Sequence, residues 1–271
     1  MSAPGAIPNR GQALPEGADK VAAVRTMFDT IAPRYDLVNR VMTFGMDRGW
    51  RRATVASLSL VPGSVVLDLA CGTGDLCRDV VDAGYRAVGI DLSLGMLRHA
   101  RTPSPLVQGD ALALPFPESS IDGVVSGFAL RNFVELPAVF AELARVLRPG
   151  GRMALLDVAH PENPVLRAGH AVYFGRVVPI IGGLLSDAAA YRYLPRSVAY
   201  LPTPDELLNQ LAAARFADAE RRLLSAGITQ LYTATRTPDP PPATDTDPTP
   251  PASPPSDGVR ASDDQSQGTI E

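Results

Sequence analysis

The sequence has few of the residues that build metal centres or disulfide frameworks. Its 271 residues include 2 cysteines and 3 histidines. Cys71 and Cys77 are too few for a disulfide framework, and the histidines do not stand beside them at the spacing of metal ligands. We therefore expect no metal site. The low cysteine content is typical of a reducing compartment, which favours a cytoplasmic protein.

Long apolar runs are also scarce. The first twenty residues lack the apolar core of a secretory signal. The most apolar segment, residues 165–185, is interrupted by Arg167, His170 and Arg176. A membrane-spanning helix prefers about 20 mostly apolar residues. The sequence therefore predicts that this segment does not cross a membrane.

The negative charge of the chain is concentrated at its C-terminal end. From about Thr237 onward the sequence is rich in Pro, Asp, Ser and Thr, and seven of the 29 acidic residues but one of the 25 basic residues lie there. The remainder carries about +2, which argues against a nucleic-acid binder. A segment so poor in apolar residues cannot bury enough surface to fold. We predict a flexible N-terminus at 1–20, one α/β domain at 21–236 and a disordered acidic, Pro-rich tail at 237–271.

Within that domain, short β-branched runs alternate with helical patterns. Five such runs are each expected to form a strand, and two final runs can pair antiparallel; the seven are 64–70, 85–91, 104–110, 121–127, 152–159, 219–226 and 228–236. Two or three helices precede them, within residues 21–58. Strands that alternate with helices form a mostly parallel sheet covered on both faces. The sequence thus predicts a doubly wound, seven-stranded α/β fold with N-terminal helices and a helical lid insertion near 165–185.

The first of these strands ends in a glycine-rich turn, VLDLACGTGD, residues 66–75. Gly72 and Gly74 allow a sharp turn and let a ligand approach the backbone. A dinucleotide-binding turn would have Gly or Ala where Cys77 stands. Asp75 near the start of the next helix would repel a pyrophosphate, and Asp68 adds negative charge. The turn therefore favours a cationic ligand without phosphates over a nicotinamide dinucleotide.

Acidic residues also end the next two strands. Asp91 is placed to accept hydrogen bonds from ribose hydroxyls, and Asp110 with the Ala111 amide is placed to meet an adenine edge. The alternative is that Asp91 caps a helix and Asp110 merely ends a strand. With the glycine turn, the two acids favour a nucleoside-type cofactor. S-adenosylmethionine fits because it carries a sulfonium and an amino group but no phosphate.

The sequence resembles the class I S-adenosylmethionine-dependent methyltransferases in VLDLACGTGD, GIDLSLGML, GDALALPFPESSID and RVLRPGGR. FDTIAPRYD, LRN and AYRYLPRSV make it similar, more specifically, to the ubiquinone/menaquinone biosynthesis C-methyltransferase family, over residues 21–236. The resemblance implies cofactor contacts by Thr73, Asp91, Asp110 and Ala111. Gly127 stands where the family usually has a serine, so a backbone group is expected to replace that contact.

The resemblance implies methyl transfer to a ring carbon of a prenylated quinol. Arg131 is expected to hold the forming phenolate oxygen, and Asn132 the second ring oxygen. Tyr35 or Asp36 would orient the quinol or relay its proton. Alternatively, Arg131 and Asn132 cap the following helix and Tyr35 packs in an amphipathic helix.

We expect demethylmenaquinol as the substrate, because abundant Ala, Arg and Pro with a single lysine are typical of GC-rich bacterial genomes, where menaquinone is usual. The alternatives are another prenylated quinol or small phenol, or a non-catalytic cofactor-binding protein. A prenylated quinol resides in a bilayer, so segment 165–185 is a candidate substrate tunnel or surface-docking helix at the inner face of the membrane. It is otherwise a simple lid or the contact of a homodimer.

Overall fold

A computed structural model describes residues 15–159, 161–187, 190 and 196–238. Two predicted segments lie largely outside these residues: the flexible N-terminus, of which residues 15–20 are described, and the acidic tail, of which residues 237 and 238 are described. Helix α1 begins at Gly17, four residues before the position where we expected the domain to begin.

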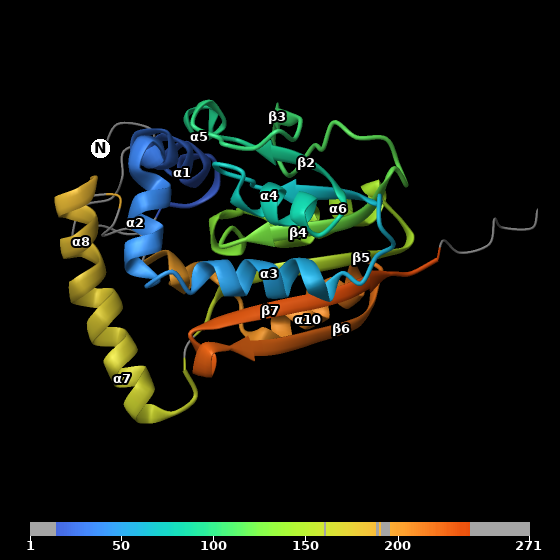
Figure 1. The fold of residues 1–271 in the computed structure, drawn as a ribbon. Helices are drawn as coiled ribbons and strands as arrows, with labels where there is room; N and C mark the ends of the chain where they lie inside the picture. Colours follow the sequence, from blue (N-terminus) through green and yellow to red (C-terminus); the bar gives the residue numbers. More distant parts are fainter. Residues whose placement is uncertain (1–14, 160, 188–189, 191–195, 239–271) are drawn as a thin grey trace, which may run out of the picture. The chain divides into compact units, whose positions relative to one another are not determined.

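The centre of the fold is the predicted seven-stranded sheet, in the order β3-β2-β1-β4-β5-β7-β6 (Figure 1). Strands β1 to β5 run parallel, and β7 is antiparallel to both β5 and β6. The bounds are β1 (Val65–Leu69), β2 (Arg86–Asp91), β3 (Leu106–Gln108), β4 (Ile121–Gly127), β5 (Leu147–Val158), β6 (Phe216–Leu224) and β7 (Thr229–Arg236). Strands β2 and β3 are added to one side of β1, and β4 and β5 to the other, so the strand order reverses between β1 and β4. Doubly wound folds bind ligands at such a reversal, at the carboxyl ends of the strands.

Strand β5 begins five residues before its predicted start at Arg152. Leu147 pairs with Ile121 of β4, and a register shift then separates this pair from the regular ladder that starts at Gly123 and Arg152. The Pro149-Gly150-Gly151 segment, which follows the end of α6 at Val146, therefore lies within an irregular strand and not in a free loop.

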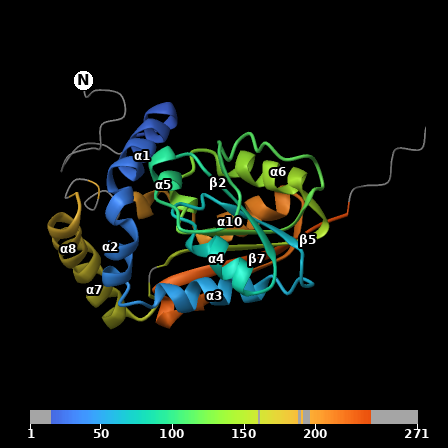
Figure 2. The same cartoon turned by 45° about the horizontal axis from the view of Figure 1, so that its top comes forward.

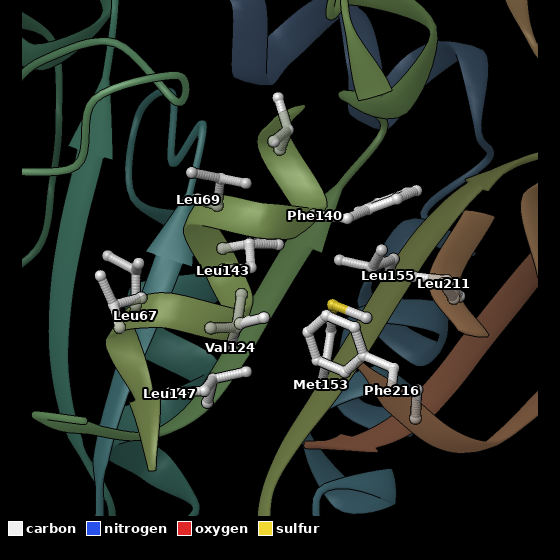
Figure 3. Packing of buried hydrophobic residues seen from close by; sticks show 14 of the residues in the cluster. Leu67, Leu69, Val124, Phe140, Leu143, Leu147, Met153, Leu155, Leu211 and Phe216 are labelled. Carbon is white, nitrogen blue, oxygen red and sulfur yellow. The ribbon is translucent and has the colours of Figure 1, made fainter. Parts of the chain in front are cut away.

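Helices cover both faces of the sheet (Figures 1 and 2). On one face lie α3 (Asp47–Ser57) and α4 (Asp75–Asp82); α6 (Leu136–Val146) and α10 (Pro204–Ala213) lie on the other; α5 (Leu94–Arg98) follows β2. Helix α6 buries an apolar face that includes Val139, Phe140 and Leu143. Figure 3 shows Phe140 and Leu143 packed against Leu155 and Val124 of the sheet. This packing fixes the strand ends that carry the candidate site.

The N-terminal helices lie beside the carboxyl ends of the strands. Helix α1 (Gly17–Ile31) passes through a 3-10 turn, Ala32–Arg34, into α2 (Tyr35–Met42). Pro33 lies within that turn, and its ring, which cannot continue a helix interior, accounts for the boundary between the two helices.

The insertion forms α7 (Pro164–Val172), a π-helical turn (Tyr173–Val177) and α8 (Val178–Leu185). Pro179 lies in the first turn of α8, where its missing N–H costs no helical hydrogen bond. In both Figure 1 and Figure 2, α8 lies alongside α2.

Candidate functional site

Two adjoining cavities lie at the carboxyl ends of β1, β2 and β4. The inner cavity, about 110 Å³, lies between α1 and the strand ends. The outer cavity, about 460 Å³, lies between α2, α3 and the insertion formed by α7 and α8. Six residues line both cavities: Phe28, Tyr35, Ala70, Gly72, Gly127 and Phe128. A ligand bound in one cavity can therefore meet a ligand bound in the other.

The two glycines of the predicted cofactor turn have different roles. Gly72 has a φ of +55°, and a Cβ added there would meet nothing within 4 Å. It therefore leaves open space beside the backbone, as the sequence predicted. Gly74 has a φ of +81°, and its added Cβ would lie 2.6 Å from Cγ2 of Thr102. Gly74 lines neither cavity, so it serves the close packing of this loop.

Asp91 at the end of β2 fixes the turn and faces the inner cavity. Its Oδ2 accepts a hydrogen bond from the Gly72 amide at 2.7 Å, and its Oδ1 accepts one from the Ser93 amide at 2.8 Å. Burial raises the pKa of Asp91, whereas these amide hydrogen bonds lower it. The side chain of Ser93, not that of Asp91, caps α5.

The other predicted cofactor residues divide between the two cavities. Asp110 and Ala111 line the inner cavity, and Asp110 accepts a hydrogen bond from the Leu112 amide at 3.0 Å. Gly127 lines both cavities, and an added Cβ there would lie 3.0 Å from Cδ1 of Leu76. Thr73 lines the outer cavity.

Asp68 is a buried carboxylate without a cationic partner in direct contact. It is 1% exposed, it lines the outer cavity beside the glycine turn, and within the described residues neither of its oxygens has a partner at full hydrogen-bond geometry. Burial raises the pKa of Asp68 to about 7, and the nearby Cys77 thiol and amide and the charge of Arg51 offset this effect only in part. Buried carboxylates are normally paired, so Asp68 fits a cationic group of a bound ligand.

Asp75 weakens one step of the sequence argument. Its carboxylate forms ion pairs with Arg78 and with Nη1 of Arg51, the latter at 3.1 Å. Arg51 also forms ion pairs with Asp47 and Asp79, so it links three carboxylates. A neutralised Asp75 repels an anion much less than we expected, so the preference for a cationic ligand depends on Asp68.

Arg131 lines the outer cavity and is held by a buried ion pair. Its Nη1 lies 2.5 Å from Oδ1 of Asp157, which is fully buried, and its Nε donates to Oγ of Ser197 at 3.2 Å. These contacts do not cap α6, which begins at Leu136. The sequence prediction missed Asp157 as the partner, although its position near the end of β5, next to β4, is a signal that could have identified it.

The remaining three catalytic candidates lie in three different environments. Tyr35 lines both cavities, and burial raises its pKa. Asn132 lines the inner cavity only, and its buried Oδ1 has no hydrogen-bond partner among the described residues. Asp36 lines neither cavity, and its Oδ1 accepts a hydrogen bond from the Thr73 hydroxyl at 2.5 Å. The structure thus brings Arg131 and Tyr35 to one cavity, places Asn132 in the inner cavity, and places Asp36 against Thr73 of the cofactor turn.

Aromatic residues that the sequence did not single out form much of the outer cavity. Trp50 is 6% exposed, its Nε1 donates to Oγ of Ser225 at 2.7 Å, and its ring lies 6.1 Å from that of Phe128. Phe174 and Tyr173 of the insertion line the opposite side. The cavity is therefore suited to a flat, apolar ring.

Comparison with known structures identifies the class of protein. A complex of a putative methyltransferase with the Trm112 activator of Haloferax volcanii gives a TM-score of 0.58 at 20% identity, covering 78% of this chain and 98% of that chain. A Haemonchus contortus phosphoethanolamine N-methyltransferase solved with S-adenosyl-L-methionine gives 0.53 at 15% identity, covering 70% and 53%. The chain has the class I methyltransferase fold.

Comparison with sequences identifies the family. The model of the ubiE/COQ5 methyltransferase family matches residues 16–236. A demethylmenaquinone methyltransferase of Roseiflexus castenholzii is 42% identical over 228 residues, covering 81% of this chain and 96% of that protein. The UbiE ubiquinone/menaquinone C-methyltransferase of Syntrophotalea carbinolica is 41% identical over 222 residues, covering 78% and 93%. This chain belongs to the ubiE/COQ5 methyltransferase family, which confirms the resemblance inferred from its motifs.

Proposed function

We propose that this enzyme transfers a methyl group from S-adenosylmethionine to a ring carbon of demethylmenaquinol, giving menaquinol. Family membership supports the methyl transfer. Relatives from Roseiflexus castenholzii and Deinococcus radiodurans, each 42% identical to this chain, are named demethylmenaquinone methyltransferases. These names support demethylmenaquinol as the substrate.

The residues around the glycine turn suit S-adenosylmethionine. Asp91, Asp110 and Ala111 line the inner cavity and offer partners to a ribose and an adenine. Asp68 offers an unpaired carboxylate to the cationic methionine part. When bound, the cofactor supplies a methyl group activated by its attachment to a positively charged sulfur.

The outer cavity is the observation that carries the proposal. Its volume of about 460 Å³ lies within the range of about 300–1,000 Å³ usual for small-molecule sites. Its walls are mainly apolar and aromatic, and it opens directly onto the inner cavity beside Tyr35 and Phe128. A naphthoquinol ring placed there can present the face of its reacting carbon towards a cofactor held at the glycine turn. Such alignment can contribute about 7–11 kcal/mol to lowering the barrier.

Arg131 has the position and charge to stabilise a phenolate. A quinol carbon becomes nucleophilic when its neighbouring hydroxyl loses a proton, and a fixed guanidinium stabilises the resulting anion. Arg131 stays protonated, so it acts by charge and not as the base. Asp157 holds the guanidinium in place. Tyr35, which lines both cavities, orients the quinol. The unpaired Oδ1 of Asn132 lies in the inner cavity, where it can accept a hydrogen bond from the cofactor.

The test is methyl transfer from labelled S-adenosylmethionine to chemically reduced demethylmenaquinone under anaerobic conditions. Labelled menaquinol supports the proposal. Transfer only to a ubiquinone precursor or to a simple phenol would leave a methyltransferase with another substrate. Tight S-adenosylhomocysteine binding without transfer to any of them would indicate a non-catalytic cofactor-binding protein.

We further propose that the enzyme is cytoplasmic and docks on the inner face of an anionic bilayer through its insertion. None of the described helices is long and apolar enough to span a membrane. Val172 of α7 is 55% exposed and Leu184 of α8 is 79% exposed, and neither lines the outer cavity. Residues 163–186 include arginines but no acidic residue, which suits an anionic lipid surface. Tyr173 and Phe174 of the same insertion line the outer cavity, so docking would bring a bilayer-embedded quinol next to its site.

Liposome co-sedimentation tests this docking. Val172→Asp with Leu184→Asp should reduce binding to anionic vesicles several-fold. The control is Val61→Asp, which replaces a residue that is 74% exposed in the loop before β1, and it should bind like the unaltered protein. Equal pelleting of all three proteins would exclude the insertion as the docking surface. A loss of dimerisation in the double variant would indicate a homodimer contact instead.

A further inference from the structure

Lys20, the only lysine of the sequence, is buried in α1. It is 4% exposed, its Nζ donates a hydrogen bond to the Phe133 carbonyl at 2.7 Å, and it lies 3.7 Å from the centre of the Tyr200 ring. In the described part of the chain no carboxylate forms an ion pair with it. Burying an ammonium group is costly unless its partners are well placed. An apolar residue would serve simple packing better.

The hydrogen bond of Lys20 joins two parts of the site. Phe133 directly follows the 3-10 turn that carries Arg131 and Asn132. On the other side of the bond, Val24 and Phe28 of α1 line the inner cavity. The helix that covers the cofactor cavity is thus tied to the turn that carries the phenolate-binding arginine.

The other end of α1 is tied to the loop that follows β2. Oδ1 of Asp29 accepts hydrogen bonds from the Ser93 hydroxyl at 2.6 Å and from the Gly95 amide at 2.7 Å. The amide of Ser93 donates in turn to Asp91. Lys20 and Asp29 are nine residues apart, or about 14 Å along a helix. Helix α1 therefore bridges the ribose-binding loop and the catalytic turn.

A cofactor bound at the strand ends would lie against α1, because Val24 and Phe28 of this helix line the inner cavity. Lys20 ties the same helix to the Phe133 carbonyl. The position that α1 takes on the bound cofactor is therefore transmitted to Phe133 and to the 3-10 turn before it.

We propose that Lys20 is a positioning residue that couples cofactor binding beneath α1 to the placement of Arg131 in the outer cavity. The inference rests on the proposed function, because it assigns the inner cavity and the adjoining glycine turn with Asp68 to the cofactor, and the remainder of the outer cavity to the quinol. Burial lowers the pKa of Lys20 to about 8, so it remains mainly a charged donor at neutral pH.

The first test measures this coupling by calorimetry. The affinity for S-adenosylhomocysteine is compared with and without a short-chain menaquinol, kept reduced. In the unaltered protein, the quinol should tighten binding by at least about fivefold, the lower end of usual coupling between sites. Lys20→Met should abolish this gain, and Lys20→Arg, which keeps a charged donor, should restore part of it. Thr26→Met places the same residue on the exposed side of α1 and should retain the full gain.

Coupling that survives in Lys20→Met would overturn the proposal. A second measurement uses the unaltered protein, so it does not depend on the folding of a variant. An amine-reactive reagent modifies Lys20 as the only side-chain amine, and the α-amino group of the chain is the internal reference. S-adenosylhomocysteine should slow modification of Lys20 at least about tenfold relative to that reference, because α1 is then held between the cofactor and Phe133, and equal rates would contradict the contact of α1 with the bound cofactor. Protection without methyl transfer would contradict the proposed function alone.

Discussion

Asp68 gives the most informative prediction, because its carboxyl group is buried, has no ion-pair partner and has a pKa close to neutral pH. A cationic ligand should bind its ionised form. With a pKa of about 7, the ionised fraction rises from about 3% at pH 5.5 to about 50% at pH 7.0. Cofactor affinity should therefore increase about 16-fold over this range, or about 1.6 kcal/mol. The amino group of the ligand stays protonated throughout, since amino groups of this type have a pKa of about 8.

The assay is calorimetric titration with S-adenosylhomocysteine at several pH values. Binding at pH 6 should release nearly one proton, seen as a dependence of the measured enthalpy on the buffer. Asp68→Asn should bind more weakly at pH 7 and show an almost flat pH profile. Asp82→Asn, which alters an exposed carboxyl group of α4, should keep the slope. An unchanged slope in Asp68→Asn would refute the assignment of Asp68 to the cation.

The same pKa has a consequence for the stability of the free protein. Its raised value means that the contribution of Asp68 to stability is complete below about pH 4 and is lost as the pH rises through about 7. Asp68→Asn should therefore raise Tm most at pH 8, raise it less at pH 5, and change it little below about pH 4. A lower Tm at pH 8 would show that the ionised carboxylate has a compensating partner.

Four further substitutions test the site and the packing around it. Asp91→Ala removes the acceptor of two backbone amides and should weaken S-adenosylhomocysteine binding by about 1.5–3 kcal/mol, measured by calorimetry. Arg131→Ala should abolish turnover and leave cofactor affinity nearly intact. It should also cost about 3–5 kcal/mol of stability in denaturant titrations, because Asp157 is left buried and unpaired. A large loss of cofactor affinity would remove Arg131 from its catalytic role. Gly95→Ala should lower both Tm and cofactor affinity, because its Cβ would lie 2.7 Å from the backbone of α1, whereas Gly169→Ala has open space and should raise Tm slightly.

The sequence predicted the elements that depend on local pattern. The β-branched runs, the glycine turn and Pro33 each indicate a local conformation, and the observed strands and helix boundary follow them. The irregular start of β5 was not predictable in this way, because it depends on pairing between Leu147 and Ile121, which belongs to the neighbouring strand.

The candidate site was predictable as a set of positions but not as a set of contacts. Asp91 and Asp110 follow successive strands, so their approach to one cavity follows from the topology. The partners of Arg131 and Asp75 are side chains from other elements, and no local pattern indicates them. Lys20 is an extreme case: its sequence neighbourhood is that of an ordinary helix, and its role depends on a carbonyl group 113 residues away.

The central claim is methyl transfer to carbon in the ring of demethylmenaquinol. The direct measurement is mass spectrometry with fragmentation of the product formed anaerobically from reduced demethylmenaquinone and methyl-labelled S-adenosylmethionine. The proposed mechanism predicts one labelled methyl group, carried on a ring carbon, and its loss in Arg131→Ala. Label on a ring oxygen, or no product from a folded protein saturated with cofactor, would contradict it.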